Sequence, residues 1–157
     1  MNDDASTSVT VTPPYLELSR EFGAPVAAVW RATVDPELVV RWLGPARNTT
    51  RVERWEMRTG GSYRYLQITP DGIEQAFRGV VHRIVEERSR VQTFEWEGAP
   101  DQVALEYTSF DDLRDRTRLR TRTVFPSTEA LEQALINGME AGIRESLERL
   151  ARVAREI

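Results

Sequence analysis

Few side chains in this sequence could carry acid–base or covalent chemistry near neutral pH. The chain has one histidine and no cysteine, and all 21 of its basic residues are arginine, so a thiol nucleophile, a thiolate metal site and a Schiff-base lysine are excluded. His82 could be a general base or a structural residue, because apolar residues flank it on both sides and leave its direction open. Glu53, Glu56 or Glu74 could supply a buried carboxylate. We expect no catalytic residue, no metal and no cofactor.

A second group of side chains could line a site for an apolar molecule. Tyr63 and Tyr65 take the strand parity opposite to Arg64, and Tyr107 takes the parity opposite to Glu106. Ligand sites combine an apolar lining with a few hydrogen-bonding groups, so we assign these tyrosines to the inner face, although a single residue of this kind is more often plain core than a ligand contact. Further candidates for the same site are Trp55, Phe77, Trp96, Met139 and Ile143.

Composition limits the partners and the compartment. The net charge is −4 and the pI is near 5.2, which argues against nucleic acid, because binding phosphates requires a concentrated basic surface. No apolar run approaches the roughly 20 residues that span a bilayer. With 157 residues, the chain has the size of one domain, and we expect it in the cytoplasm.

The elements that must position these side chains begin after a polar segment. Residues 1–13 are poor in large apolar groups and predict a disordered tail, which leaves 14–157 as a single domain. Tyr15 opens a first strand. A short helix follows from Pro25, and a second short helix follows Asp35, which is a typical N-cap residue.

Between residues 49 and 125 the hydrophobic pattern has a period of two, with turn residues at regular intervals. Six such runs predict an antiparallel meander with one solvated face. The inner parity of the last run holds Leu119, Thr121, Thr123 and Phe125. The arginines between them are expected outside, in cross-strand ion pairs rather than in an anion site. Their expected partners are Glu95, Glu97 and Glu106.

A C-terminal helix is predicted from a cap at Ser127 or Thr128 onward, with an apolar stripe about seven turns and about 40 Å long. Gly138 and Gly142 lie one turn apart inside this stripe. Each should cost about 1 kcal/mol relative to alanine. Two explanations remain open: close packing of the helix backbone onto a strand, or space for a guest molecule beside the helix.

Five segments carry a family resemblance: "REFGAPVAAVWRATVDPELVVRWLGP", "EMRTGGSYRYLQITPDG", "FRGVVHRIVEERSRVQTFEWE", "RTRLRTRTVF" and "GMEAGIRESLERL". From about Tyr15 to Val153 the chain resembles the heat-shock protein 90 ATPase activator-like family of the START-related helix-grip superfamily. The resemblance implies an α+β fold in which a seven-stranded antiparallel sheet wraps a long C-terminal helix, with two short helices after the first strand. It also implies a cavity for small apolar or amphipathic ligands, with Trp42 at its mouth.

Residues and resemblance together lead us to expect a cytoplasmic protein that binds a small hydrophobic or aromatic ligand between the sheet and the long helix. The predicted ligand contacts are Trp42, Trp55, Tyr63, Tyr65, Phe77, Trp96, Tyr107, Met139, Gly142 and Ile143. Two alternatives stay open: an interaction module like the chaperone activator, and a cofactor-free cyclase or hydrolase that uses the same cavity. A protein partner or a homodimer is compatible with each.

Overall fold

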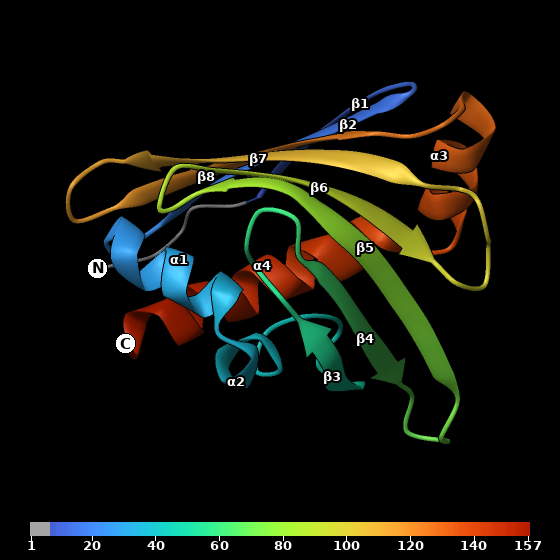
Figure 1. The fold of residues 1–157 in the computed structure, drawn as a ribbon, viewed down its shortest axis with the longest axis horizontal. Coiled ribbons are helices and arrows are strands. Elements are labelled where there is room, and N and C mark those ends of the chain that lie inside the picture. Colours follow the sequence, from blue (N-terminus) through green and yellow to red (C-terminus); the bar gives the residue numbers. More distant parts are fainter. Residues whose placement is uncertain (1–6) are drawn as a thin grey trace.

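Eight strands and four helices make up the fold in this computed structural model, which describes residues 7–157. They are β1 (Ser8–Thr12), β2 (Tyr15–Phe22), α1 (Val26–Val34), α2 (Pro36–Val39), β3 (Thr49–Trp55), β4 (Ser62–Ile68), β5 (Glu74–Val85), β6 (Ser89–Trp96), β7 (Ala104–Asp112), β8 (Thr117–Val124), α3 (Thr128–Ile136) and α4 (Met139–Arg155). The strands form one antiparallel sheet in the order β1-β2-β8-β7-β6-β5-β4-β3 (Figure 1). The expected helix-grip architecture is confirmed, with eight strands in place of seven.

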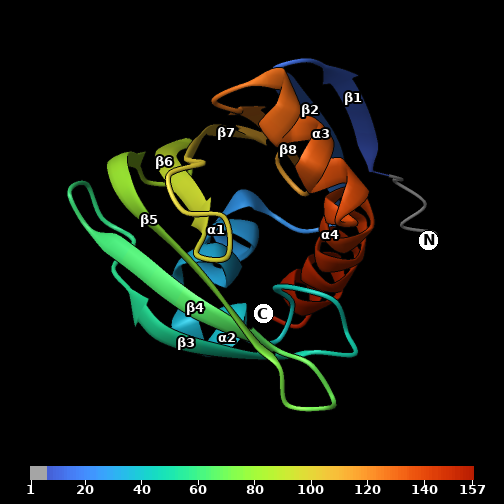
Figure 2. The same cartoon turned by 90° about the vertical axis from the view of Figure 1, so that its right-hand side faces the viewer.

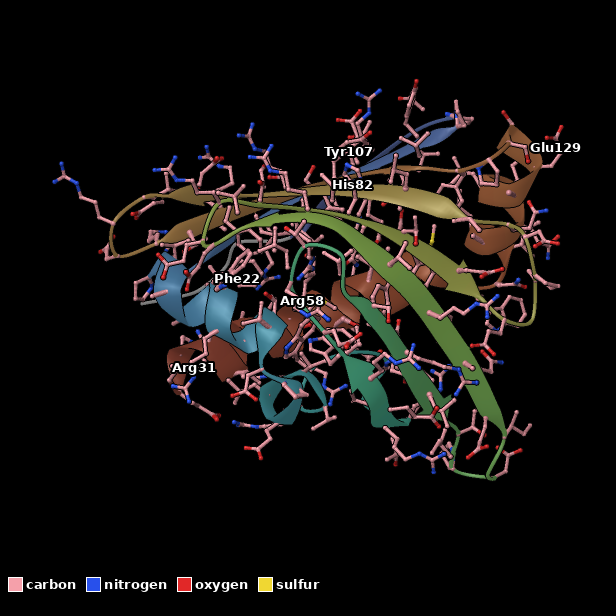
Figure 3. The ribbon with its side chains drawn as sticks, viewed as in Figure 1. Phe22, Arg31, Arg58, His82, Tyr107 and Glu129 are labelled. Carbon is pink, nitrogen blue, oxygen red and sulfur yellow. The ribbon has the colours of Figure 1, made fainter. Side chains whose placement is uncertain are left out.

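The sheet curls around α4, as the end-on view in Figure 2 shows. Two register shifts help it to bend, one in β3 between Val52 and Arg54 and one in β5 between Val81 and Arg83. Such bulges increase the local twist of a sheet. At the β5 bulge His82 is exposed and lies on the outer side of the sheet (Figure 3), which settles the direction that its sequence context left open.

The sheet, α1 and the second half of α4 pack into the largest core cluster. Phe22 and Val29 are 0% exposed and Leu150 is 1% exposed. Trp30 meets Phe110 edge to face, with 5.1 Å between the ring centroids. Each fully buried side chain of this size contributes about 1.5–3 kcal/mol, so this end of the molecule is held by packed apolar groups. Figure 3 shows Phe22 between the sheet and α1.

The helix α2 and the loop after it are fixed by side-chain hydrogen bonds. The predicted cap is confirmed: the Asp35 carboxylate accepts from the Glu37 backbone N–H at 2.9 Å. The Trp42 indole donates to the Ala32 carbonyl at 2.8 Å and thereby holds the loop against α1. Gly44 donates its backbone N–H to the Ser146 hydroxyl at 2.8 Å, which ties the loop to α4.

The C-terminal helix is not continuous, and this corrects the sequence-based prediction. The expected cap at Ser127 is present and accepts from the Ala130 N–H, but α3 ends at Ile136. Gly138 has a φ of +87° and starts α4 as its N-cap. A left-handed conformation costs a glycine little, so this residue serves the break between two helices rather than a helix interior. Within residues 7–157, none of the helices is long and apolar enough to cross a bilayer.

The N-terminal segment also differs from its prediction. Part of the expected tail is strand β1, which pairs with β2 from Ser8 opposite Ser19 to Thr12 opposite Tyr15. This strand is mostly exposed, so it needs few large apolar residues. Its alternation of Ser, Thr and Val is weak and its flanking residues are polar, so the sequence did not indicate a strand here. Residues 1–6, the rest of the predicted tail, lie outside the described residues.

The outer face of β8 carries arginines, as predicted, but with other partners. Arg118 pairs with Glu21 of β2 at 2.8 Å, and Arg120 pairs with Asp111 of β7 at 2.8 Å. The partners that the sequence pattern favoured were Glu95, Glu97 and Glu106. The first two pair with arginines of β4 and β5 instead, and the third lies on the inner face of the sheet. Ion pairs this exposed contribute about 1 kcal/mol or less each, so they mainly keep the face solvated.

Candidate ligand-binding cavity

A cavity of about 320 Å³ lies between the inner face of the sheet and α4. Its volume is in the range of small-molecule sites, and its walls are mainly aromatic and aliphatic. Among the residues that line it are these predicted contacts: Trp42, Trp55, Tyr63, Tyr65, Phe77, Met139, Gly142 and Ile143. The structure therefore brings together eight of the ten side chains that the sequence pointed to.

The other two predicted contacts, Trp96 and Tyr107, are not among the residues lining this cavity. Trp96 is at the end of β6, where its ring lies over the backbone of Gly98. Tyr107 is 47% exposed and borders a groove on the outer face of the sheet (Figure 3). Its predicted inward direction is wrong, because β7 turns its other parity inward, with Ala104 and Phe110 buried at its two ends.

One wall of the cavity is a series of aromatic rings from β3 to β6. Trp55 meets Tyr63 edge to face, with centroids 5.4 Å apart. Tyr65 and Phe77 are stacked at 5.2 Å, and Phe77 and Phe94 are stacked at 5.6 Å. The Tyr63 hydroxyl donates to the Thr93 carbonyl, which fixes its ring within the wall. This wall offers a guest a large apolar surface made of rings that hold one another in place.

Across from this wall, α4 presents Met139, Gly142 and Ile143. A Cβ added at Gly142 would meet no atom within 4 Å. Close packing of backbone onto strand therefore does not explain this glycine, and its missing side chain leaves open space in the cavity lining. The flexible thioether of Met139 lies one turn earlier, where it can adapt to the shape of a guest.

A second wall is polar and comes from β6, β7 and β8. Two adjacent cross-strand rows face the cavity there: Arg90, Thr108 and Thr121, followed by Gln92, Glu106 and Thr123. In the first row the two threonine hydroxyls are 3.1 Å apart and hydrogen-bonded. In the second, Gln92 Nε2 donates to Glu106 Oε1 at 3.0 Å. Six polar side chains in register on an inner sheet face are unusual, since inner faces are normally apolar.

Glu106 is the carboxylate that the cavity holds. Burial raises the pKa of Glu106, while the hydrogen bond from Gln92 and the charge of Arg90 act in the opposite direction. The carboxylates named from the sequence as candidates for burial, Glu53, Glu56 and Glu74, are all exposed. Within residues 7–157, no three carboxylate or histidine side chains are grouped in a way that could hold a metal ion.

Arg90 is the cation of the polar wall. Its Nε and Nη1 atoms are shielded from solvent and make no hydrogen bond with any of residues 7–157. Burial lowers the pKa of Arg90, and the nearby Glu106 carboxylate and Tyr63 partly offset this. An arginine stays protonated inside a protein, so the cavity contains a guanidinium with unused donors.

Sequence reasoning missed Arg90, Gln92 and Glu106. A signal for the first two was present: Trp96 was predicted as a ligand contact, and counting back from it along β6 in steps of two gives Phe94, Gln92 and then Arg90. In β7 the signal was ambiguous, because one parity contains Leu105 and Tyr107 while the other contains a glutamate. Strand faces are assigned from sequence on the assumption that the inner face is apolar. That assumption fails here because half of the inner face is polar.

Known protein structures share this fold. A protein from Arthrobacter aurescens has a similar solution structure, with a TM-score of 0.88, 27% identity, and coverage of 96% of this chain and 92% of the other. Ms6760 from Mycobacterium smegmatis superposes with a TM-score of 0.85 at 24% identity over 94% and 95% of the two chains. DynU16, encoded in the dynemicin biosynthetic locus, shares the fold at a TM-score of 0.68 and 21% identity, over 90% of this chain and 47% of its own.

A comparison with curated protein sequences gave no match. The family described as "Activator of Hsp90 ATPase homolog 1-like protein" matches residues 23–155, which include both short helices, most of the residues that line the cavity and all of α4. The chain therefore belongs to the Activator of Hsp90 ATPase homolog 1-like protein family.

Proposed function

We propose that the protein binds a small hydrophobic or aromatic molecule in the cavity between its sheet and α4. The observation that carries this proposal is the open space at Gly142, directly opposite a wall of aromatic rings. A glycine inside a helix lowers the stability of the fold by about 1 kcal/mol relative to alanine. At Gly142 neither a turn nor a close backbone contact explains why the residue is a glycine. A vacancy that lowers stability is understandable if a guest molecule fills it.

The binding free energy would come mainly from apolar burial, at about 25 cal/mol for each Å² removed from water. Trp55, Tyr65 and Phe77 would supply aromatic contact surface to the guest, and Ile143 lines the cavity from α4. The polar wall on β6 and β7 would orient the guest, as the few polar groups of ligand sites commonly do. The site is thus suited to an amphipathic molecule of one to three rings.

The test is the replacement Gly142→Leu. With wild-type protein, a two-ring aromatic compound at 100 times its Kd should stabilise the fold by about 2.7 kcal/mol. For a chain of this size that is a rise in Tm of about 5–10 °C, measured by thermal unfolding with and without the compound. The leucine side chain would occupy the cavity, so the variant should fold and lose this rise.

Ala141→Leu is the matched control, because Ala141 is the exposed neighbour of Gly142 on the same helix. It should keep the full rise in Tm. If a panel of one- to three-ring compounds leaves the wild-type Tm unchanged, the proposal is wrong. A protein-interaction role, the alternative that the family description raises, predicts instead that Gly142→Leu has no effect on partner capture.

A cofactor-free enzyme in the same cavity is a second candidate, and one observation favours it. Glu106 places a carboxylate with a raised pKa on the cavity wall, as an acid–base catalyst requires. If this candidate holds, Glu106→Gln should abolish turnover of a bound compound and leave its Kd within about threefold. Unchanged turnover in that variant would exclude this role for Glu106.

A further inference from the structure

We propose that the ligand carries an oxygen acceptor, a carbonyl or a carboxylate, and that the guanidinium of Arg90 donates hydrogen bonds to it. This inference rests on the proposed function and specifies the chemical class of the guest. It follows from the position of Arg90, from its unused donors, and from the aromatic wall beside it.

Arg90 belongs to the inner face of β6. It lies opposite Thr108 of β7, and it shares this face of β6 with Gln92 and Phe94, which also line the cavity. Its Nε and Nη1 atoms are shielded from solvent and have no hydrogen-bond partner among residues 7–157. A buried donor without a partner destabilises the fold, and more so when it is charged. An arginine kept in this state indicates that its partner is supplied from outside the chain.

The neighbouring side chains do not provide that partner. Glu106 is on the adjacent strand one row further along, yet neither Nε nor Nη1 of Arg90 donates a hydrogen bond to its carboxylate. Glu106 Oε1 accepts from Gln92 instead. The hydroxyls of Thr108 and Thr121 bond to each other. Arg90 therefore faces the cavity with an incomplete shell, in which the missing group must be an acceptor because a guanidinium only donates.

The rest of the guest is defined by the aromatic wall. Tyr63 is close enough to Arg90 to affect its pKa, and its ring is also in contact with Trp55. A ring seated on this wall can carry its oxygen directly to the guanidinium. An aryl ketone or an aryl carboxylate matches both features, and a pure hydrocarbon matches only the first.

The experiment compares two probes of equal size, 2-acetylnaphthalene and 2-isopropenylnaphthalene, in which a CH₂ group replaces the carbonyl oxygen. The Kd of each is measured by fluorescence titration of the full chain. Hydrogen bonds to a charged group are worth about 1.5–3 kcal/mol, so the ketone should bind the wild type about 10- to 100-fold more tightly. In Arg90→Met this preference should vanish, while the hydrocarbon Kd stays within about threefold. Arg90→Lys should keep part of the preference.

Arg120→Met is the control, because Arg120 lies on the outer face and pairs with Asp111 there. It should leave both Kd values unchanged. If both probes bind the wild type equally well, or the preference survives Arg90→Met, the inference is wrong while the proposed function stands. If neither probe binds, the inference falls together with the proposed function.

Discussion

The two halves of α4 face the same sheet and have opposite surroundings. From Leu147 onward the inward side chains are buried against α1 and the sheet, and Leu150 is 1% exposed. In the first half, Met139 and Ile143 are only half-buried, and Gly142 meets open space. One continuous helix therefore serves as a packed anchor at one end and as the wall of a cavity at the other. The comparison teaches that one helix can be tightly packed along some of its turns and leave open space beside others.

The largest expected effect comes from breaking the packed half. Leu150→Ala should lower the free energy of unfolding by about 2–5 kcal/mol, because it removes a fully buried side chain and leaves a void. Met139→Ala in the cavity half should cost about 1 kcal/mol or less, since that side chain stays partly exposed. Urea denaturation of both variants measures the contrast. Equal losses would mean that the two halves do not differ.

A smaller change in stability is expected from the substitution Gly138→Ala. Its sign depends on whether the C-terminal helix is continuous or breaks at this residue. In a continuous helix Gly138→Ala would stabilise the protein by about 1 kcal/mol. At the observed φ of +87° it should instead destabilise by about 1–2 kcal/mol, because alanine is strained in the left-handed region. No atom lies within 4 Å of the added Cβ, so backbone strain is the only cost. A gain in stability on thermal unfolding would contradict the break between α3 and α4.

The smallest effect should appear in the polar wall, where the influences on Glu106 partly cancel. Its pKa is raised in the folded protein, so its ionisation opposes folding: the stability it contributes is complete below its unfolded-state pKa of 4.5 and is lost as the pH rises through the folded-state pKa. Glu106→Gln should remove this loss and be more stable than the wild type at neutral pH, with little difference near pH 4. The free energy of unfolding, measured across this range, checks the sign. A neutral-pH loss in the variant would show that the hydrogen bond from Gln92 outweighs burial.

The sequence predicted most of the architecture because its local signals agree with the fold. The alternation from Leu119 to Phe125 is a true inner face, and the cap at Asp35 forms as expected. Its limits are equally physical. In β7 the glutamate Glu106 faces inward and the tyrosine Tyr107 faces outward. Choosing the more hydrophobic residue as the inward one therefore gave the wrong direction for Tyr107. Parity along β6 indicates that Arg90 faces inward, but the cross-strand register was needed to place Glu106 on the same wall, and register is a property of the assembled sheet.

Among residues 7–157, the strand order puts β1 and β3 at the two edges of the sheet. The outward groups of β3 include Arg51, Glu53 and Arg54, and charges of this kind discourage another chain from adding a strand. The five residues of β1, Ser8–Thr12, bear no charge. Edge-to-edge pairing between copies of this protein would accordingly start at β1. The substitution Thr10→Lys would place a charge on this edge strand and should block such pairing.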